Sequence, residues 1–348
     1  EVYNILLASS DYIEKLNPDY IGQLGAGRLN AFRAVFMAQE HLKTNSTYVL
    51  NSPYKDADSL INITNIKGEQ MSTIDVLGDF KGGFKTISAD LTGNGNKEII
   101  VSASEGGGPL LQIFSTEGKL LNQFFAYNKN FRGGVNISTG DINGDGIDEI
   151  ITGAGPGGGP HVRVFDKDGN VLRQFFPFDI NFRGGVDVAV ADVNADGSDD
   201  IVTGAGPGGG PHIKVFDNSM NLISHFFAFE NDFRGGVEIE VADINGGARK
   251  KFEIIATKAS NGGPQVKVFD FRCKLISSFD AFSKKYKGRV NISSGDINND
   301  GLDEIITSAG PLGAPHVRTF DSNGKLLAAY YAYDLNFLGG VNTSILIK

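Results

Sequence analysis

The sequence predicts an all-β fold made of six copies of a four-stranded unit, on three observations. An aromatic residue followed closely by glycine recurs with a step of 51 residues, except in one interval that is two residues longer. An acidic loop of the form Asp-x-Asn-x-Asp-Gly recurs with the same step. In addition, 46 glycines stand beside 41% hydrophobic residues, as expected for many turns between short buried strands. The repeated aromatic residues are Phe80, Phe131, Phe182, Phe233, Tyr286 and Phe337.

Composition excludes several classes of protein. The formal net charge of −9 argues against nucleic acid and anionic membrane partners. No apolar run approaches the roughly 18 residues that a membrane span requires. Cys273 is the only cysteine, which excludes a disulfide framework and a cysteine-based zinc site. We therefore expect a protein without a membrane span, and we expect a monomer.

Residues 1–47 are predicted to form a separate helical segment. Apolar residues at helical spacing predict a first helix that ends before Asn17-Pro18 and a second helix from about Arg28 to Leu42. Two helices in so short a segment cannot bury both apolar faces by themselves. They need further protein to pack against.

From residue 48 onward each unit contains four short strand candidates. In the third unit these are residues 186–191, 200–203, 212–216 and 222–229. A unit of about 50 residues with four strands has the size of one blade of a β-propeller. The domain predicted for residues 48–348 is therefore a β-propeller.

The spacing also predicts the number of blades. The acidic loop that should follow Asp296 would begin at Ile347, so the last unit supplies only its innermost strand, residues 341–347. Near the other end, residues 48–51 align with residues 98–101, and the residues after them align with a third and a fourth strand. We predict that residues 341–347 pair antiparallel with residues 48–51. This composite sixth blade would close the ring without an open edge.

Three of the acidic loops are complete and predict cation sites. Oxygen side chains on alternate positions converge, glycine permits the sharp turn, the seventh residue offers its backbone carbonyl, and the ninth residue closes the shell. Ligands that are all oxygen suit calcium better than zinc or copper. The candidate ligands are Asp141, Asn143, Asp145, Ile147 and Glu149; Asp192, Asn194, Asp196, Ser198 and Asp200; and Asp296, Asn298, Asp300, Leu302 and Glu304.

Two alternatives stay open for these loops. The same residues could form turns capped by Asp and Asn side chains with no bound metal. Where the eighth and ninth residues are both acidic, either could complete the shell, as with Asp148 and Glu149 or Asp303 and Glu304.

The remaining two loops are degraded. The loop that starts at Asp90 keeps only two acids. The loop that starts at Asp243 has Gly247 in place of the third ligand, two inserted residues and three basic residues, Arg249, Lys250 and Lys251, whose charges could replace a metal. Whether either loop binds calcium stays open.

Other repeated motifs predict structure rather than chemistry. The Gly-Ala-Gly-Pro segments are not phosphate loops, because no Gly-Lys-Ser/Thr and no helix follow them. The recurring His161, His212 and His316 are predicted to be hydrogen-bonded side chains at strand ends. Aromatic runs are predicted to pack between blades, and an aromatic platform for sugar is the alternative. These runs begin at Phe124, Phe175, Phe226 and Tyr330.

Two resemblances extend this interpretation. Through its acidic loops and Gly-Ala-Gly-Pro segments, residues 48–348 resemble the FG-GAP/VCBS family of calcium-binding β-propellers, found in integrin α heads and bacterial surface proteins. Integrin heads have seven blades, so the count of six rests on this sequence alone. Residues 1–35, with Asn17-Pro18 and the Gly-x-Gly-Arg-Leu-Asn-Ala element at 25–31, resemble the last two helices of the subtilisin-like serine peptidase domain.

The second resemblance implies a nucleophile segment upstream of residue 1 and a peptidase domain in cis, since this chain contains no catalytic triad. We therefore expect a non-catalytic, calcium-stabilised propeller appended to a secreted or cell-surface subtilisin-like serine endopeptidase of bacterial type. It would serve attachment, targeting or stability, with a cell-surface protein or a carbohydrate as partner. The alternative is a propeller enzyme or a lectin-like module that acts through one face of the ring. No repeat-breaking cluster of His, Asp and Ser within one unit supports an enzyme.

Overall fold

The computed structural model describes residues 47–55, 57–78, 80–246, 252–260 and 262–347, together with the strands at 10–11 and 28–29. The chain divides into two compact units, Glu1–Ser46 and Thr47–Lys348. In the first unit β1 (Ser10–Asp11) pairs antiparallel with β2 (Arg28–Leu29). Strand thus replaces the helix predicted at these four residues, because their backbone groups bond to each other across the pair. The rest of the two predicted helices lies outside the described residues.

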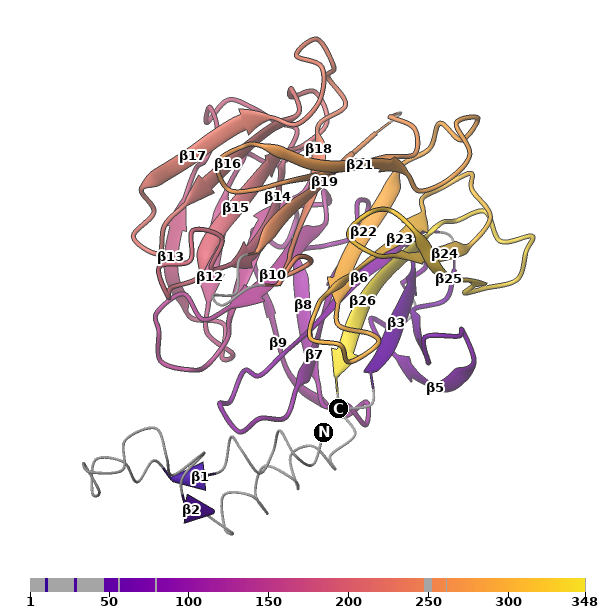
Figure 1. The fold of residues 1–348 in the computed structure, drawn as a ribbon, viewed down its shortest axis with the longest axis horizontal. Coiled ribbons are helices and arrows are strands. Elements are labelled where there is room, and N and C mark those ends of the chain that lie inside the picture. The colour runs from indigo at the N-terminus through magenta and orange to yellow at the C-terminus, as the bar shows by residue number, and fades with distance from the viewer. Residues whose placement is uncertain are drawn as a thin grey trace. The chain divides into compact units, whose positions relative to one another are not determined.

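The second unit consists of six four-stranded antiparallel sheets, the blades (Figure 1). Blade 1 consists of β6 (Phe84–Ala89), β7 (Glu98–Ala103), β8 (Leu110–Phe114) and β9 (Leu120–Phe125). Blade 2 consists of β10 (Val135–Gly140), β11 (Glu149–Ala154), β12 (Val162–Phe165) and β13 (Val171–Phe175). Blade 3 consists of β14 (Val186–Ala191), β15 (Asp200–Ala205), β16 (His212–Phe216) and β17 (Leu222–Phe227). Blade 4 consists of β18 (Val237–Ala242), β19 (Glu253–Lys258), β20 (Gln265–Phe269) and β21 (Leu275–Asp280). Blade 5 is β22 (Val290–Gly295), β23 (Glu304–Ala309), β24 (His316–Phe320) and β25 (Leu326–Tyr331).

Blade 6 is the predicted composite. It places β26 (Val341–Ile347) beside β3 (Thr47–Pro53), which is followed by β4 (Leu60–Thr64) and β5 (Gln70–Asp75). The pairing is antiparallel, with Leu346 opposite Tyr48 and Thr343 opposite Asn51. Figure 1 shows the yellow carboxyl-terminal strand alongside the indigo β3. The predicted closure is confirmed, and the ladder extends as far as Pro53.

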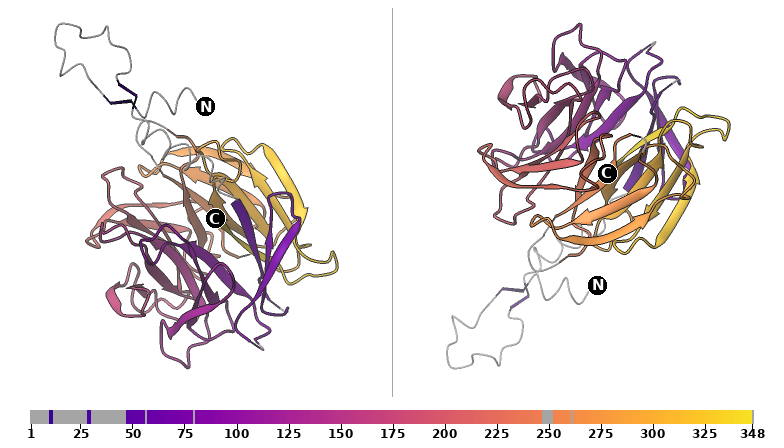
Figure 2. Two further views of the ribbon diagram at one scale, coloured as in Figure 1. Left: turned by 90° about the horizontal axis from the view of Figure 1, so that it is seen from below. Right: turned by 90° about the horizontal axis from the view of Figure 1, so that it is seen from above.

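The six blades form a closed ring. The first strand of each blade contacts the first strands of both neighbouring blades, in the order β6, β10, β14, β18, β22, β26 and back to β6. The views in Figure 2 show these sheets arranged around one centre. Neighbouring blades stack face to face, so every inner strand packs between two others. The fold is a six-bladed β-propeller, as predicted.

The two inner strands of each blade are more buried than its fourth strand. Every residue of the second strands β7, β11, β15 and β23 is buried. The fourth strands alternate exposed and half-buried residues, as in β9. The cores lie between blades, for example where residues of blades 3 and 4 form one buried cluster. Each fully buried Val or Ile side chain there contributes about 1.5–3 kcal/mol relative to an exposed one.

Within the described ranges, no helix is long and apolar enough to cross a lipid bilayer.

The composite blade makes the carboxyl-terminal strand essential for stability. Deletion of residues 339–348 removes β26 and leaves the backbone donors and acceptors of β3 without partners. We expect the truncated chain to aggregate or to melt far below the intact chain in a thermal melt followed by circular dichroism. Deletion of Lys348 alone is the control and should leave the melting temperature unchanged. A cooperative melt of the truncated chain at the wild-type temperature would contradict the importance of closure.

Candidate functional site

The three complete acidic loops share one conformation, organised by their first aspartate. In blade 2, Asp141 Oδ1 accepts hydrogen bonds from the backbone N–H groups of Gly144 (2.7 Å) and Asp145 (3.0 Å), and Oδ2 accepts one from Gly146 (2.8 Å). Asp192 and Asp296 accept the bonds from their fifth and sixth residues at 2.8–3.1 Å. The first carboxylate therefore faces into its own loop in all three blades.

The side chains at the third and fifth positions continue this pattern. Asn143 Oδ1 accepts from the N–H of Asp145, and Asp145 Oδ1 accepts from the N–H of Ile147, both at 2.9 Å. Asn298 and Asp300 make the same bonds at 2.8 and 2.9 Å. In these two loops the third and fifth predicted ligands are each held by the backbone N–H two residues further along.

The ninth residue belongs to its own loop. Glu149 is buried; its Oε2 accepts from the N–H of Ile142 (2.9 Å) and its Oε1 from Asn143 Nδ2 (2.6 Å). Burial, together with the nearby Asp145 and Asp141 carboxylates, raises the pKa of Glu149 to about 7. Glu304 and Asp200 have the same surroundings, and burial raises the pKa of each to about 7.

The eighth residue points to the preceding blade, a role that the sequence analysis missed. Asp148 Oδ2 accepts from the N–H of Asp90 at 2.9 Å, and Asp303 Oδ2 accepts from the N–H of Asp243 at 2.9 Å. In the same way Asp199 Oδ2 accepts from the N–H of Asp141 at 2.9 Å. We call Asp148, Asp199 and Asp303 the blade staples. In the sequence, each of these residues is the first of two adjacent acids. The second acid accepts hydrogen bonds within its own loop, and the first accepts one from the neighbouring blade.

The degraded loop of blade 1 shows what the turn requires. The N–H groups of Asn94 and Gly95 donate to Asp90, and the N–H of Asn96 donates to Asn94 Oδ1. An amide at the fifth position therefore holds the turn as well as the carboxylate of Asp145 does. In the loop of blade 4 Gly246 still donates to Asp243 Oδ1 (3.1 Å), while its substituted residues 247–251 lie outside the described ranges.

The oxygen atoms that each loop offers are ligands of the kind that calcium prefers, but they are not arranged as a complete coordination shell. Among the described residues, no group of three or more Asp, Glu, His or Cys side chains is placed to hold a metal ion. The donors that each loop offers are all oxygen, which suits calcium. A carboxylate has about four lone-pair positions, and the loop N–H groups use three of those on Asp141.

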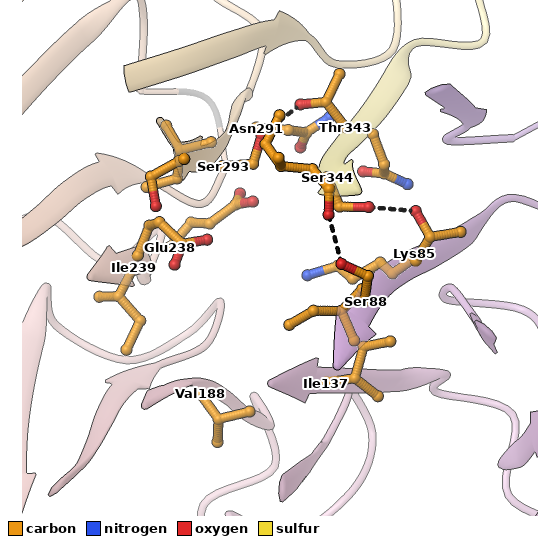
Figure 3. Close-up of a pocket in the computed structure, with 18 of the residues that line it drawn as sticks. Lys85, Ser88, Ile137, Val188, Glu238, Ile239, Asn291, Ser293, Thr343 and Ser344 are labelled. Carbon is orange, nitrogen blue, oxygen red and sulfur yellow. Dashed lines mark hydrogen bonds between the residues drawn. The ribbon is translucent and has the colours of Figure 1, made fainter. Parts of the chain in front are cut away.

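A second candidate site is a cavity of about 300 Å³ on the propeller axis, enclosed by the inner strands of all six blades (Figure 3). The second residue of each inner strand differs around the ring: Lys85, Asn136, Asp187, Glu238, Asn291 and Asn342. The three asparagines donate to backbone carbonyls of the next blade, at 2.5–2.8 Å. The other three residues are charged and break the repeat.

The charged residues on the axis form two ion pairs. Lys85 Nζ lies 3.7 Å from Asp187 Oδ1, and Arg289 Nη2 lies 2.6 Å from Glu238 Oε2. Arg289 stands where all five other repeats have the second glycine of their Gly-Gly pair, and its guanidinium lies over Tyr54, 5.3 Å from the ring centroid. These charges come from different units and meet only at the axis, so they form no cluster within one unit of the sequence.

In each aromatic run, the first ring packs against a neighbouring blade and the second ring is exposed. The first ring of each run packs against the next blade as predicted, as Phe124 does with Phe165 (centroids 5.1 Å apart). For the second ring the packing prediction is wrong, because strand alternation turns it outward: Phe125 is 55% exposed and Phe227 47%. Phe227 and Arg234 line a cavity of about 380 Å³ at the rim, and Phe125 and Arg132 line the equivalent one of about 510 Å³.

The three recurring histidines stack on these outer rings, for example His212 on Phe227 at 4.6 Å between centroids. His161 is hydrogen-bonded as predicted, with Nε2 3.0 Å from Gln174 Oε1. His212 differs, because its Nε2 is buried without a hydrogen-bond partner in the described part of the chain. Burial, together with the nearby Lys214 and His225, lowers the pKa of His212 to about 4.

His212 should make stability depend on pH on the acid side. Its folded pKa of about 4 lies below the ordinary 6.5, so the unfolded chain binds more protons between these values and stability falls as the pH drops from 6.5 to 4. The variant His212→Leu, which copies Leu110 of blade 1, should lose part of this slope in thermal melts across that range. Lys325→Gln, at an exposed lysine that does not contribute to this pKa shift, should retain it. Equal slopes for wild type and His212→Leu would contradict the assignment.

Comparison with known proteins supports the fold and no family. No family model matches the sequence, and no curated protein matches it. A solved protein of unknown function from Bacteroides caccae is similar with a TM-score of 0.54 at 11% identity, over 87% of this chain and 99% of that chain. Weaker likenesses are a rhamnogalacturonan lyase from Bacillus licheniformis (TM-score 0.43, 15% identity, 88% and 69% covered) and the Dos1 propeller (0.45, 14%, 82% and 72%). At 11% identity, the likeness to the Bacteroides caccae protein shows a shared fold alone.

Proposed function

We propose that this chain is a non-catalytic, calcium-stabilised β-propeller appended to a subtilisin-like serine peptidase, serving attachment, targeting or stability of a secreted or cell-surface protein. The single observation that carries the calcium part is the contrast between loops. Blade 1 forms the turn with Asn94 at the fifth position, whereas the three complete loops place Asp145, Asp196 or Asp300 there. Since the turn needs only an amide, the carboxylates have a different use.

The cost of these carboxylates supports a cation. In the loop of blade 2, Asp141 and Asp145 both disfavour ionisation of the buried Glu149. Like charges so close together destabilise the folded state unless a positive charge offsets them. Bound calcium would supply that charge, held by the loop's carboxylates, its amide and a backbone carbonyl.

The peptidase attachment rests on the resemblance of residues 1–35. It is tested by reading the coding sequence upstream of Glu1 for an Asp, a His and a Ser in subtilisin-like motifs. Their absence would contradict this part of the proposal and leave the calcium part unaffected.

Calcium should raise the melting temperature. Binding to the folded state alone adds about 2.7 kcal/mol per site at a hundredfold excess over Kd, and Kd values of extracellular modules lie at about 0.1–1 mM. The triple variant Asp145→Asn, Asp196→Asn, Asp300→Asn gives each loop the amide of blade 1 and should keep the fold but lose most of the calcium response. The measurement is a thermal melt in excess chelator and in about 10 mM calcium.

A control variant guards against nonspecific charge effects. Asp168→Asn changes an exposed acid in the β12–β13 hairpin, and it should leave the response at the wild-type value. A wild-type melting temperature that is the same in chelator and in calcium would refute the calcium proposal.

The exposed second rings favour one other function, a lectin-like module that binds carbohydrate at the rim. Phe125, Phe176, Phe227 and Tyr331 are 45–55% exposed, one in each of four blades. At two of them an arginine lines the same cavity as the ring. A flat apolar face with adjacent hydrogen-bond donors suits a sugar ring, which has both C–H and O–H groups, and repetition would add avidity.

A glycan array tests this second function. The wild type should bind a defined set of glycans, and the double variant Phe125→Asp, Phe227→Asp, which copies Asp280 of blade 4, should lose at least tenfold in signal. Exposed Leu121→Asp is the matched control. An array without any bound glycan would remove the lectin-like candidate.

A further inference from the structure

At the fourth residue of the inner strands, one blade places in the axial cavity a carboxyl group that forms no ion pair in the described part of the chain. In blade 4 this residue is Glu240 of β18, which lines the cavity and is half-buried. The other blades have small, hydroxyl or apolar residues at this position: Ile87, Ser138, Ala189, Ser293 and Ser344. Glu240 is therefore a departure from the repeat whose side chain reaches the central space.

The cations around the cavity are already paired with other acids. Lys85 lies beside Asp187 (3.7 Å), Arg289 beside Glu238 (2.6 Å) and Lys97 beside Asp148 (3.5 Å). Within the described part of the chain Glu240 forms no ion pair, and its Oε1 accepts a hydrogen bond from the N–H of the next residue, Val241, at 3.0 Å. The cavity thus has one more carboxyl group than the cations that line it.

The surroundings of Glu240 favour a positive ligand. Burial, together with the nearby carboxylates of Asp187, Asp303 and Glu238, raises the pKa of Glu240 to about 8. Ionisation of a buried carboxyl group is costly unless a cation lies beside it. A ligand that brings a positive charge to Glu240 would remove this cost.

The size and lining of the cavity indicate the kind of cation. Its volume of about 300 Å³ exceeds the roughly 30 Å³ that one water occupies, so several non-hydrogen atoms fit. The described residues contain no group of three acids, histidines or cysteines placed to hold a metal. Ile137, Val188 and Ile239 supply apolar surface (Figure 3), and hydroxyl pairs such as Ser344 and Thr86, 2.8 Å apart, supply further acceptors.

We propose that the axial cavity binds a small organic cation, a primary amine, whose ammonium group pairs with the carboxylate of Glu240. An ammonium group has three hydrogen-bond donors and no acceptor, which matches one carboxylate among hydroxyl oxygens. A short alkyl chain on the amine matches the isoleucine and valine side chains of the wall. This site is independent of the calcium loops and of the rim.

Propylamine is the probe, and isothermal titration of the full chain in chelator-containing buffer is the measurement. Propylamine is protonated at neutral pH and should bind, whereas 1-propanol, which has the same chain without the charge, should bind at least tenfold more weakly. Glu240→Gln should also weaken propylamine binding at least tenfold. Glu69→Gln, at an exposed glutamate in the β4–β5 hairpin of blade 6, should leave it unchanged.

Two results would overturn the proposal. One is a wild-type chain that shows no binding heat with propylamine up to about 100 mM, a limit near 1.4 kcal/mol of binding free energy. The other is a folded Glu240→Gln variant with wild-type affinity. Should Glu240→Gln fail to fold, wild-type crystals soaked in propylamine decide: an ammonium nitrogen within hydrogen-bond distance of Glu240 supports the proposal, and propylamine bound elsewhere or not at all overturns it.

Discussion

The packing of each inner strand between two neighbouring inner strands is the constraint on which this structure depends. The ring β6, β10, β14, β18, β22, β26 closes only if every blade contributes one strand of similar length near the axis. That requirement explains the constant unit length and the composite blade. It also brings side chains from all six blades to one small space. Residues more than 200 positions apart, such as Lys85 and Arg289, line the same axis for this reason.

The fold could be predicted from the sequence because its information is local and repeated. The step between Phe131 and Phe182 sets the unit length, and the loop expected at Ile347 shows that one blade must be shared. The candidate cation loops were equally visible, since their donors lie within nine residues. The axial site was not visible in this way. Glu240 and Lys85 belong to different units, and only closure of the ring brings them to the same cavity.

The different roles of two adjacent acids could be assigned only from the three-dimensional structure. Asp148 and Glu149 are neighbours in sequence, but in a strand successive side chains point to opposite sides. One therefore reaches the preceding blade and the other its own loop. The staples connect blades 1, 2 and 3 into one series, and blades 4 and 5 into another. Phe252 stands before Glu253 in blade 4, where blades 2, 3 and 5 have a staple, so none is made between blades 3 and 4 there.

The pairing of β26 with β3 has a consequence for synthesis on the ribosome. Strand β3 is translated before blades 1 to 5, yet its hydrogen-bonding partner β26 is translated after them. At about 5–20 residues per second, the edge of β3 waits tens of seconds or more before it can be covered. Blades 1 to 5 can each form from contiguous sequence during that interval. The nascent chain is therefore exposed to intermolecular strand pairing at β3 until β26 has been translated, and chaperone protection of this edge would raise its yield.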